Sequence, residues 1–492
     1  MTKRRITYAL MALLLAACAA VGPEYVGAPR STADSASTFP SSVSESEEVA
    51  AVTVAEQPPQ AWWRQLEDPA LDALMTKTVA VNYDLRIAAA NVAAAQALLD
   101  QVATRRRPSV DVSAELEERR NSSAKLVIAD PDTRFPATSS GEFNTSLSWE
   151  VDLFGRVRRS IESASAELGS LEAVRNGVMV SVLAQVARAY VDLRGAQLRL
   201  GVATRNVAVQ KQTLELVELL LREGAATELD RARARTQLLT SLSTIPTLKV
   251  ANRIAVNRLT TLIAQPPGAL DSTVNAWQPL PQLVKLPEFV AVGSPTDLLR
   301  RRPDIVAAER ALAAASARIG VATADLYPTI TFGASAGVAG APLSGFAAAG
   351  GPFFAVGPSL NWNIFDRSAT YARISQADSN AAANVARFEA TVTRALEEVD
   401  SAISGYSNER VRVRQLTAAV ASSRHAADLA RLRYREGAED FLAVLDAERN
   451  LLGLEDLRAR SEINVAQRLI DIHLALGGGW EALPAPAHQP YQ

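Results

Sequence analysis

The stretches LREGAATELD, which starts at Leu221, and YREGAEDFLAVLD, which starts at Tyr434, both contain the tetrapeptide Arg-Glu-Gly-Ala. Its two copies lie 213 residues apart. Trp149, which opens WEVDLFGR, and Trp362, which opens WNIFDR, have the same separation. Two landmarks at one fixed distance indicate an internal repeat. We therefore predict a chain of two structurally repeated halves.

The repeated tetrapeptide follows two exceptionally long helical patterns. Proline is absent from residues 137–245 and 359–483, and apolar residues return there every three or four positions. A helix of about 65 residues would be about 100 Å long, which indicates a coiled coil or a similar extended assembly. Glycine closes helix C-termini, and further helical patterns follow at 228–245 and 440–476. We predict two antiparallel helical hairpins that turn at Gly224 and Gly437.

Four shorter segments alternate between apolar and polar residues. They are SVDVSAEL from Ser109, FNTSLSWEVD from Phe143, a segment around 330–338 and one around 354–364. About ten alternating residues are typical of a tilted membrane strand, although such strands also occur in ordinary half-buried sheets. Four strands are too few to close a membrane barrel, and an open edge cannot face lipid. If these strands span a membrane, several copies of the chain must complete one barrel.

The N-terminus predicts export and lipidation. A basic start, MTKRR, precedes the apolar stretch ITYALMALLLAA, which is typical of a signal peptide. The stretch ends in LAAC, which resembles a bacterial lipobox, and Cys18 is the single cysteine of the chain. The alternative is a buried structural cysteine. The next residue is Ala19 and not the aspartate associated with retention in the inner membrane, so the resemblance points to the outer membrane. A Ser-, Thr- and Pro-rich tether follows, and a packed region begins near Trp62 and Trp63.

Composition argues against several other classes. The formal net charge is −2, without the clustered basic excess of a nucleic-acid-binding protein. No window reaches the roughly 18 apolar residues of a membrane-spanning helix. The three histidines are scattered, and no nucleophile elbow or phosphate loop is present. We expect no enzyme, no cofactor and no metal site.

Taken together, the motifs resemble the TolC/OprM-type outer-membrane efflux channels, especially the lipidated branch that serves resistance–nodulation–division pumps. The resemblance runs from about Cys18 to about Trp480 and includes WWRQLEDPALDALM, LLRRRPDIVAAERALAAASARIG, WNIFDRS and YREGAEDFLAVLDAERNLL. It implies a mainly α fold with a β-barrel part, in which four membrane β-strands per chain contribute to a trimeric 12-stranded β-barrel continued by a long α-helical barrel. It also implies an outer-membrane location with a large periplasmic portion, a periplasmic adaptor and an inner-membrane pump.

The predicted organisation is as follows. Residues 1–17 form a signal peptide and 18–60 the lipidated N-terminus and extended tether; 61–290 form the first repeat, with a β-hairpin at about 108–152 and a helical tip near 222–230; 291–480 form the second repeat, with a β-hairpin at about 328–364 and a tip near 435–446; 481–492 form a flexible tail.

The resemblance also places a narrow periplasmic aperture at the helical tips, encircled by acidic side chains. By motif these are Asp230 and Asp446, while Ala443 occupies the position of a further acid found in some members. Tyr434 matches an aromatic residue that helps to hold the helices shut in some relatives, but Glu439 stands where its arginine partner is usual. The alternative for the two aspartates is a solvated helix face, with pairs to Arg233 and Arg449.

Both tips are also candidate docking surfaces for the adaptor; the alternative is that they serve only as helix caps. The residues concerned are Arg222, Glu223, Gly224, Ala225, Arg435, Glu436, Gly437 and Ala438. The predicted function is that of the outer-membrane exit duct of a tripartite efflux system. Two rival functions are a conduit for type I protein secretion and a lipid-anchored periplasmic coiled-coil scaffold without a pore.

Overall fold

The computed structural model of the chain describes residues 20–28, 33, 38–42, 52–53, 57–120, 136–276, 287, 289–341, 351–365 and 367–485. The predicted signal peptide and Cys18 lie outside these residues, as do most of the predicted tether and the last seven residues.

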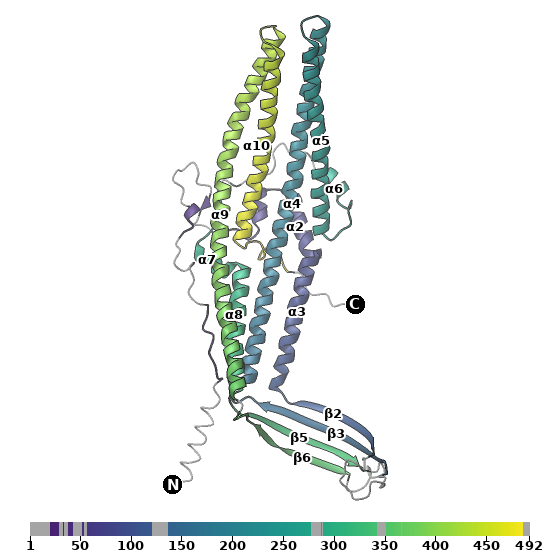
Figure 1. Cartoon of the computed structure of the whole chain (residues 1–492), viewed down its shortest axis with the longest axis vertical. Coiled ribbons are helices and arrows are strands. Elements are labelled where there is room, and N and C mark those ends of the chain that lie inside the picture. The colour runs from purple at the N-terminus through teal and green to yellow at the C-terminus, as the bar shows by residue number, and fades with distance from the viewer. Residues whose placement is uncertain are drawn as a thin grey trace. The chain divides into compact units, whose positions relative to one another are not determined.

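Long helices dominate the chain, as predicted. Helices α4 (Arg156–Arg222) and α9 (Arg367–Arg435) have 67 and 69 residues, and α5 (Glu228–Leu262) and α10 (Phe441–Ala475) have 35 each. Figure 1 shows α4 followed by α5 and α9 followed by α10 as two hairpins. Both long helices end at the arginine of the repeated tetrapeptide, which confirms the predicted turns.

Shorter helical segments complete the helical part. They are η2 (Pro40–Ser42), η3 (Trp62–Leu66), α2 (Pro69–Val81), α3 (Tyr83–Ala103), η4 (Thr104–Arg106), α6 (Asp271–Ala276), α7 (Pro295–Arg301) and α8 (Pro303–Ala324). Among the helices in the described ranges, none has a stretch that is both long and apolar enough to cross a membrane.

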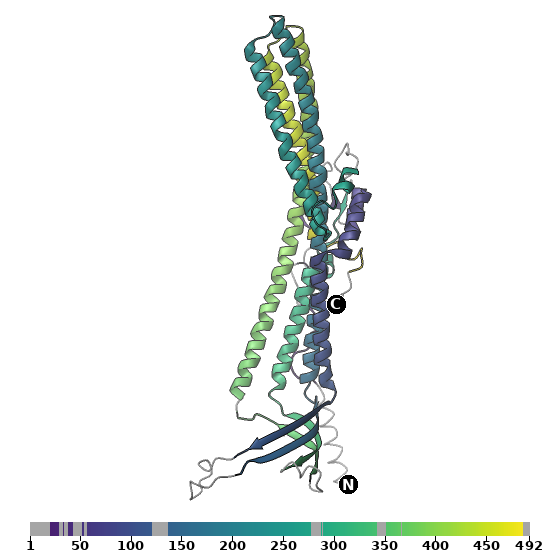
Figure 2. The same ribbon diagram turned by 90° about the vertical axis from the view of Figure 1, so that its right-hand side faces the viewer.

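The four alternating segments form one antiparallel sheet, so their prediction as strands is confirmed. The strands are β2 (Ser109–Arg119), β3 (Thr138–Val151), β5 (Thr329–Gly340) and β6 (Pro352–Asn361), in the order β2-β3-β5-β6. The register places Val151 opposite Ile330 at one end of the central pair. Figure 2 shows the sheet from a second side. A separate parallel pair joins β1 (Val52–Thr53) to β4 (Val290–Ala291).

The chain forms two compact units, and both take segments from each half of the sequence. The first unit comprises residues up to 29, 94–170 and 309–387, and the second comprises 30–93, 171–308 and 388–492. The first unit therefore contains the sheet, and the second contains both helical tips. Helices α4 and α9 contribute to both units.

The second unit has a continuous apolar core. Trp62 and Trp63 are almost completely buried in it, but Ala33 and Phe39 are buried in the same core, so packing already includes residues of the predicted tether. The Trp62 ring stacks on the imidazole of His473, with ring centroids 4.9 Å apart. At the start of α2, Asp68 caps the helix and Pro69 occupies its first position. The core is thus built from the α2 region together with the long helices.

Helix α5 is longer than the sequence pattern before Pro246 indicates. It continues through Pro246 to Leu262, although proline cannot donate a backbone hydrogen bond. Pro246 lies on an exposed part of the helix, where water can solvate the carbonyl that loses its helical donor. Tertiary packing of the residues beyond, such as Leu248 and Leu259, keeps the helix intact.

Candidate functional site at the helical tips

The two tip turns have the same backbone geometry. Gly224 and Gly437 have φ angles of 78° and 73°, in the left-handed region. The amides of Gly224 and Ala225 donate to the carbonyls of Leu221 and Leu220, at 3.1 and 2.8 Å. This is the Schellman pattern of helix termination. The second tip repeats it, because the amides of Gly437 and Ala438 donate to the carbonyls of Tyr434 and Arg433 at 3.0 and 2.8 Å. A Cβ atom on either glycine would meet nothing within 4 Å, so backbone conformation alone requires glycine.

Each returning helix begins with a side-chain cap. Thr227 and Asp230 form a capping box, in which the Thr227 amide donates to the Asp230 carboxylate at 3.0 Å and the Asp230 amide donates to the Thr227 hydroxyl oxygen at 3.2 Å. Asp440 accepts a hydrogen bond from the Ala443 amide at 3.1 Å at the start of α10. We did not predict these caps, although a Thr-x-x-Asp spacing ahead of a helix is a recognisable signal.

Asp230 is therefore committed to its own helix. Its carboxylate also accepts from the Thr227 hydroxyl at 2.6 Å and lies 3.9 Å from the Arg233 guanidinium. The Arg233 contact is the one that the alternative for Asp230 names, and the capping bonds give this residue a further, structural role.

Asp446 has a different environment. Its side chain is exposed, and a hydrogen bond from the Asn450 amide to its carboxylate is long, at 3.4 Å. Arg449, the partner considered for it, instead donates to Gln237 on α5 at 2.8 Å. Within the described part of the chain, Asp446 has no ion pair. Asp446 therefore lacks the Arg449 pair of the alternative interpretation.

Tyr434 is buried in a small apolar cluster that joins the two hairpins. The cluster contains Val217 from α4, Ala234 from α5, Tyr434 from α9, and Phe441, Val444 and Leu445 from α10. The Tyr434 and Phe441 rings are 5.5 Å apart and tilted by 56°. Burial raises the pKa of the Tyr434 hydroxyl, and the nearby negative charge of Asp230 raises it further. The phenol is therefore neutral, and the hydroxyl has no hydrogen-bond partner among the described residues. Glu439 pairs with Arg433 at 3.6 Å.

The tip surfaces themselves are open. All eight candidate docking residues are exposed. Beside them, Leu229 and Leu442 are 57% and 50% exposed and occupy matching positions at the start of α5 and α10. We did not predict these leucines, yet their separation equals that of the repeated tetrapeptide. Each tip thus presents a charged turn next to an exposed leucine.

A buried polar layer lies next to the apolar tip cluster. The Glu448 side chain is 4% exposed, and its Oε1 accepts from the Thr213 hydroxyl at 3.0 Å and from Arg431 Nε at 2.8 Å. It therefore joins α4, α9 and α10. The sequence offers one signal for this residue, because Glu448 interrupts the apolar stripe formed by Phe441, Val444 and Leu451.

No set of three or more histidine, cysteine, aspartate or glutamate side chains in the described ranges is arranged to hold a metal ion.

Fold and tips together define a mainly helical chain with a small antiparallel sheet and two matched hairpins. The chain belongs to the outer membrane efflux protein family, whose profile matches residues 74–265 and 295–478. This is a family of channel proteins and not of enzymes.

Individual relatives agree with this assignment. The chain is similar to nodulation protein T of Rhizobium leguminosarum bv. trifolii, with 30% identity over 97% of each chain. It is 29% identical to the pyoverdine export outer membrane protein OpmQ of Pseudomonas putida, over 86% of this chain and 89% of that one. Among solved structures, the outer-membrane channel OprN superposes with a TM-score of 0.83 at 35% identity, over 94% of this chain and 99% of that chain.

Proposed function

We propose that the protein is the exit duct of a tripartite efflux system. Substrates expelled by an inner-membrane pump would pass through a periplasmic adaptor into this channel and leave across the outer membrane by passive conduction. Family membership supports the channel function. The observation that carries the proposal is a four-stranded sheet that leaves apolar side chains uncovered and both edges unpaired.

The uncovered apolar side chains lie at alternating positions of the edge strands. On β2 they are Val110, Val112 and Leu116, and on β6 they are Phe354, Val356 and Leu360. The other face of β2 carries Asp111, Ser113 and Glu115, opposite Ser146, Asn144 and Glu142 of β3. One face suits lipid and the other suits water, which is the division that a membrane barrel strand requires.

The unpaired edges favour a barrel shared by several copies, and the resemblance to the family implies three of them. Strands β2 and β6 each have one neighbour among the described strands, so their outer backbone groups need partners if they enter hydrocarbon. Three copies would join β2 of one chain to β6 of the next and close a barrel of twelve strands. A scaffold without a pore would leave this apolar face without a purpose.

An internal duplication would account for the two halves. The tip turns share their hydrogen-bond pattern, and the two repeated tryptophans also make matching bonds. The Trp149 indole donates to the Arg106 carbonyl at 3.2 Å, and the Trp362 indole donates to the Leu326 carbonyl at 3.0 Å. Each tryptophan thus bonds the carbonyl of the segment that precedes the first strand of its own hairpin. We therefore retain 61–290 and 291–480 as the two repeats.

The remaining assignments follow from this function. The helical part would continue the barrel into the periplasm, and the exposed turns at 222–225 and 435–438 would dock the adaptor. A signal peptide at 1–17 and acylation of Cys18 would bring the chain to the outer membrane. Supplying cells with an alkyne-labelled fatty acid tests the last point, because the label should appear on the wild-type chain and be absent from Cys18→Ser.

The aperture is tested by ion selectivity. A ring of Asp446 carboxylates, one from each copy, would concentrate negative potential at the constriction and attract cations. In planar bilayers, Asp446→Asn should lower the cation-to-anion permeability ratio. Glu228→Gln is the control, because the Glu228 carboxylate is already paired with Arg231. Equal selectivity in wild type and Asp446→Asn would exclude the ring.

A further inference from the structure

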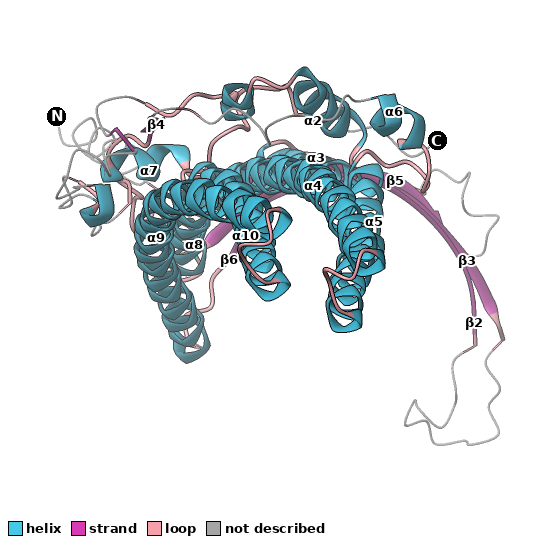
Figure 3. Ribbon diagram, turned by 90° about the horizontal axis from the view of Figure 1, so that it is seen from above, coloured by secondary structure: helices cyan, strands magenta, loops and turns pink. Residues whose placement is uncertain are grey.

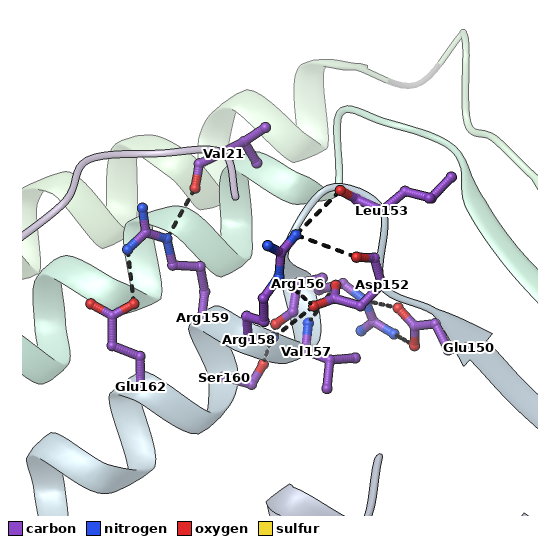
Figure 4. A network of polar contacts seen from close by, with 10 residues as sticks. All are labelled: Val21, Glu150, Asp152, Leu153, Arg156, Val157, Arg158, Arg159, Ser160 and Glu162. Atoms are coloured by element: carbon purple, nitrogen blue, oxygen red, sulfur yellow. Dashed lines mark hydrogen bonds and ion pairs between the residues drawn. The ribbon is translucent and has the colours of Figure 1, made fainter. Parts of the chain in front are cut away.

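The described segment that follows Cys18 is fixed to the junction between strand β3 and helix α4. The Val21 amide donates to the Phe154 carbonyl at 3.0 Å, and Arg159 Nε donates to the Val21 carbonyl at 3.2 Å. A second Arg159 nitrogen lies 3.4 Å from the Gly22 carbonyl. Farther along, the Tyr25 hydroxyl donates to Glu309 at 3.4 Å. Figure 4 shows Arg159 between Val21 and Glu162.

Arg159 is itself held firmly. Its side chain is about as buried as a core residue, at 7% exposed, and Glu162 accepts from it at 2.8 Å. The turn around it is ordered by Asp152, whose carboxylate accepts from the amides of Val157 and Arg158 at 3.0 and 2.9 Å. Phe154 is fixed by stacking on Tyr327, with ring centroids 4.7 Å apart. The N-terminal segment therefore meets a surface that is already organised.

Three glycines make the fit close. A Cβ atom on Gly22, whose φ is 87°, would lie 2.5 Å from the Gly320 Cα. A Cβ on Gly155 would lie 2.5 Å from the Ala20 Cβ, and one on Gly320 would lie 2.8 Å from the Arg159 Cγ. Real Cβ atoms essentially never come so close to another heavy atom. We call the surface formed by Phe154, Gly155, Arg159 and Gly320 the N-terminal cradle.

We propose that the N-terminal cradle sets where the lipid anchor enters the membrane. This inference rests on the proposed acylation of Cys18. Two residues of chain span at most about 7 Å, so Cys18 cannot move farther than that from Ala20. Ala20 lies against Gly155, four residues beyond the end of β3. The acyl chains therefore enter the bilayer at the level where the strands leave it, and Arg159 and Gly320 are positioning residues for the anchor.

The segment itself offers a matched pair of variants. Gly22→Val places a side chain against Gly320 and should expel the segment from the cradle. Gly27→Val is the control, because Gly27 also has a positive φ, 127°, but a Cβ there meets nothing within 4 Å. Both changes lie in the N-terminal segment, outside the helices and the sheet. They are at least four residues after Cys18, so the LAAC motif stays intact.

The experiment uses the full-length chain in its membrane. Cells receive a fatty acid that carries a diazirine, the acyl group is transferred to Cys18, and ultraviolet cross-links are mapped by mass spectrometry. In wild type and Gly27→Val, cross-links should concentrate at the neighbouring strand ends, around Val151 and Ile330. In Gly22→Val, this concentration of cross-links should be lost, because the segment is no longer held against the cradle.

Hydrogen exchange provides a second measure. The Val21 amide should be protected in wild type and Gly27→Val and exchange about tenfold faster in Gly22→Val, while α4 amides stay unchanged. Equal cross-link maps and equal Val21 protection in Gly22→Val and wild type would overturn the inference while leaving acylation in place. Absence of label from wild-type Cys18 would instead overturn the proposed acylation, and the inference with it.

Discussion

The imidazole of His473 is completely buried, and neither ring nitrogen has a hydrogen-bond partner among the described residues. Burial lowers its pKa from 6.5 to about 3, and the positive charge of Arg301 contributes to the shift. The folded protein thus holds a neutral His473, whereas the unfolded chain binds a proton below about pH 6.5. Protonation of this residue therefore leaves the free energy of unfolding unchanged above about pH 6.5. As the pH falls from there toward 3, the unfolded chain binds the proton and the free energy of unfolding declines.

We predict that His473→Phe flattens this dependence. In wild type, acidification from pH 7 to pH 5 should lower the urea midpoint of unfolding, since one such group contributes at most about 1.4 kcal/mol per pH unit. His473→Phe should show a smaller decline, and the exposed His425→Phe should behave as wild type. An identical pH slope in His473→Phe would contradict the assignment.

The buried carboxylate of Glu448 links three helices near the tips. Glu448→Ala removes the buried carboxylate that binds Thr213 and Arg431, so it should destabilise the hairpin pair by about 3 kcal/mol. The control Asp428→Asn removes a carboxylate from the same arginine, but that carboxylate is 62% exposed, and its loss should cost less than about 1 kcal/mol. Amide exchange near 213 and 448 measures both, and similar effects in the two variants would refute a special role for Glu448.

At the scale of elements, the repeated tetrapeptide is a turn signal. Gly224→Ala and Gly437→Ala should each destabilise their tip by about 1 kcal/mol, because alanine resists a positive φ. Gly453→Ala in α10 is the opposite case. Gly453 has a helical backbone, and a Cβ atom there would meet nothing within 4 Å. It should stabilise the helix by about 0.5–1 kcal/mol. Thermal unfolding of the three variants checks the sign, and destabilisation by all three would contradict this account.

Helices and strands were predictable because their signals are local. The helical periodicity of the long proline-free stretches, the glycines that end them and the alternation in β2, β3, β5 and β6 can each be read from residues that are neighbours in the sequence. Continuation of α5 through Pro246 was not predictable, since packing beyond the proline decides it. The capping role of Asp230 was missed, although the Thr-x-x-Asp spacing from Thr227 is a local signal for it.

Contacts between distant segments were the least predictable part of the site. Nothing near Tyr434 in sequence shows that it packs with Val217 and Ala234, and nothing near Gly22 shows that it lies against Gly320. Both arrangements bring together residues about 200 to 300 positions apart. Figure 3 shows each hairpin from above as a pair of helices. The apolar tip cluster takes its residues from all four of these helices.

At the scale of the whole molecule, the two faces of the sheet should respond differently to charge. Val112→Arg places a cation on the proposed lipid face of β2 and should cost about 2–4 kcal/mol, which would reduce assembly in the outer membrane. Ser113→Arg, on the opposite face of the same strand, should be tolerated. The yield of heat-resistant oligomer on gels measures the difference. Equal yields from the two variants would argue against a membrane-spanning strand.

The central claim is that several copies of this chain share one membrane barrel. Native mass spectrometry of the protein extracted from outer membranes in detergent tests it most directly. The account predicts an assembly of three chains, each with an acylated N-terminus, that needs detergent to stay in solution. A monomer that remains dispersed without detergent after its acyl chains are removed would contradict the account.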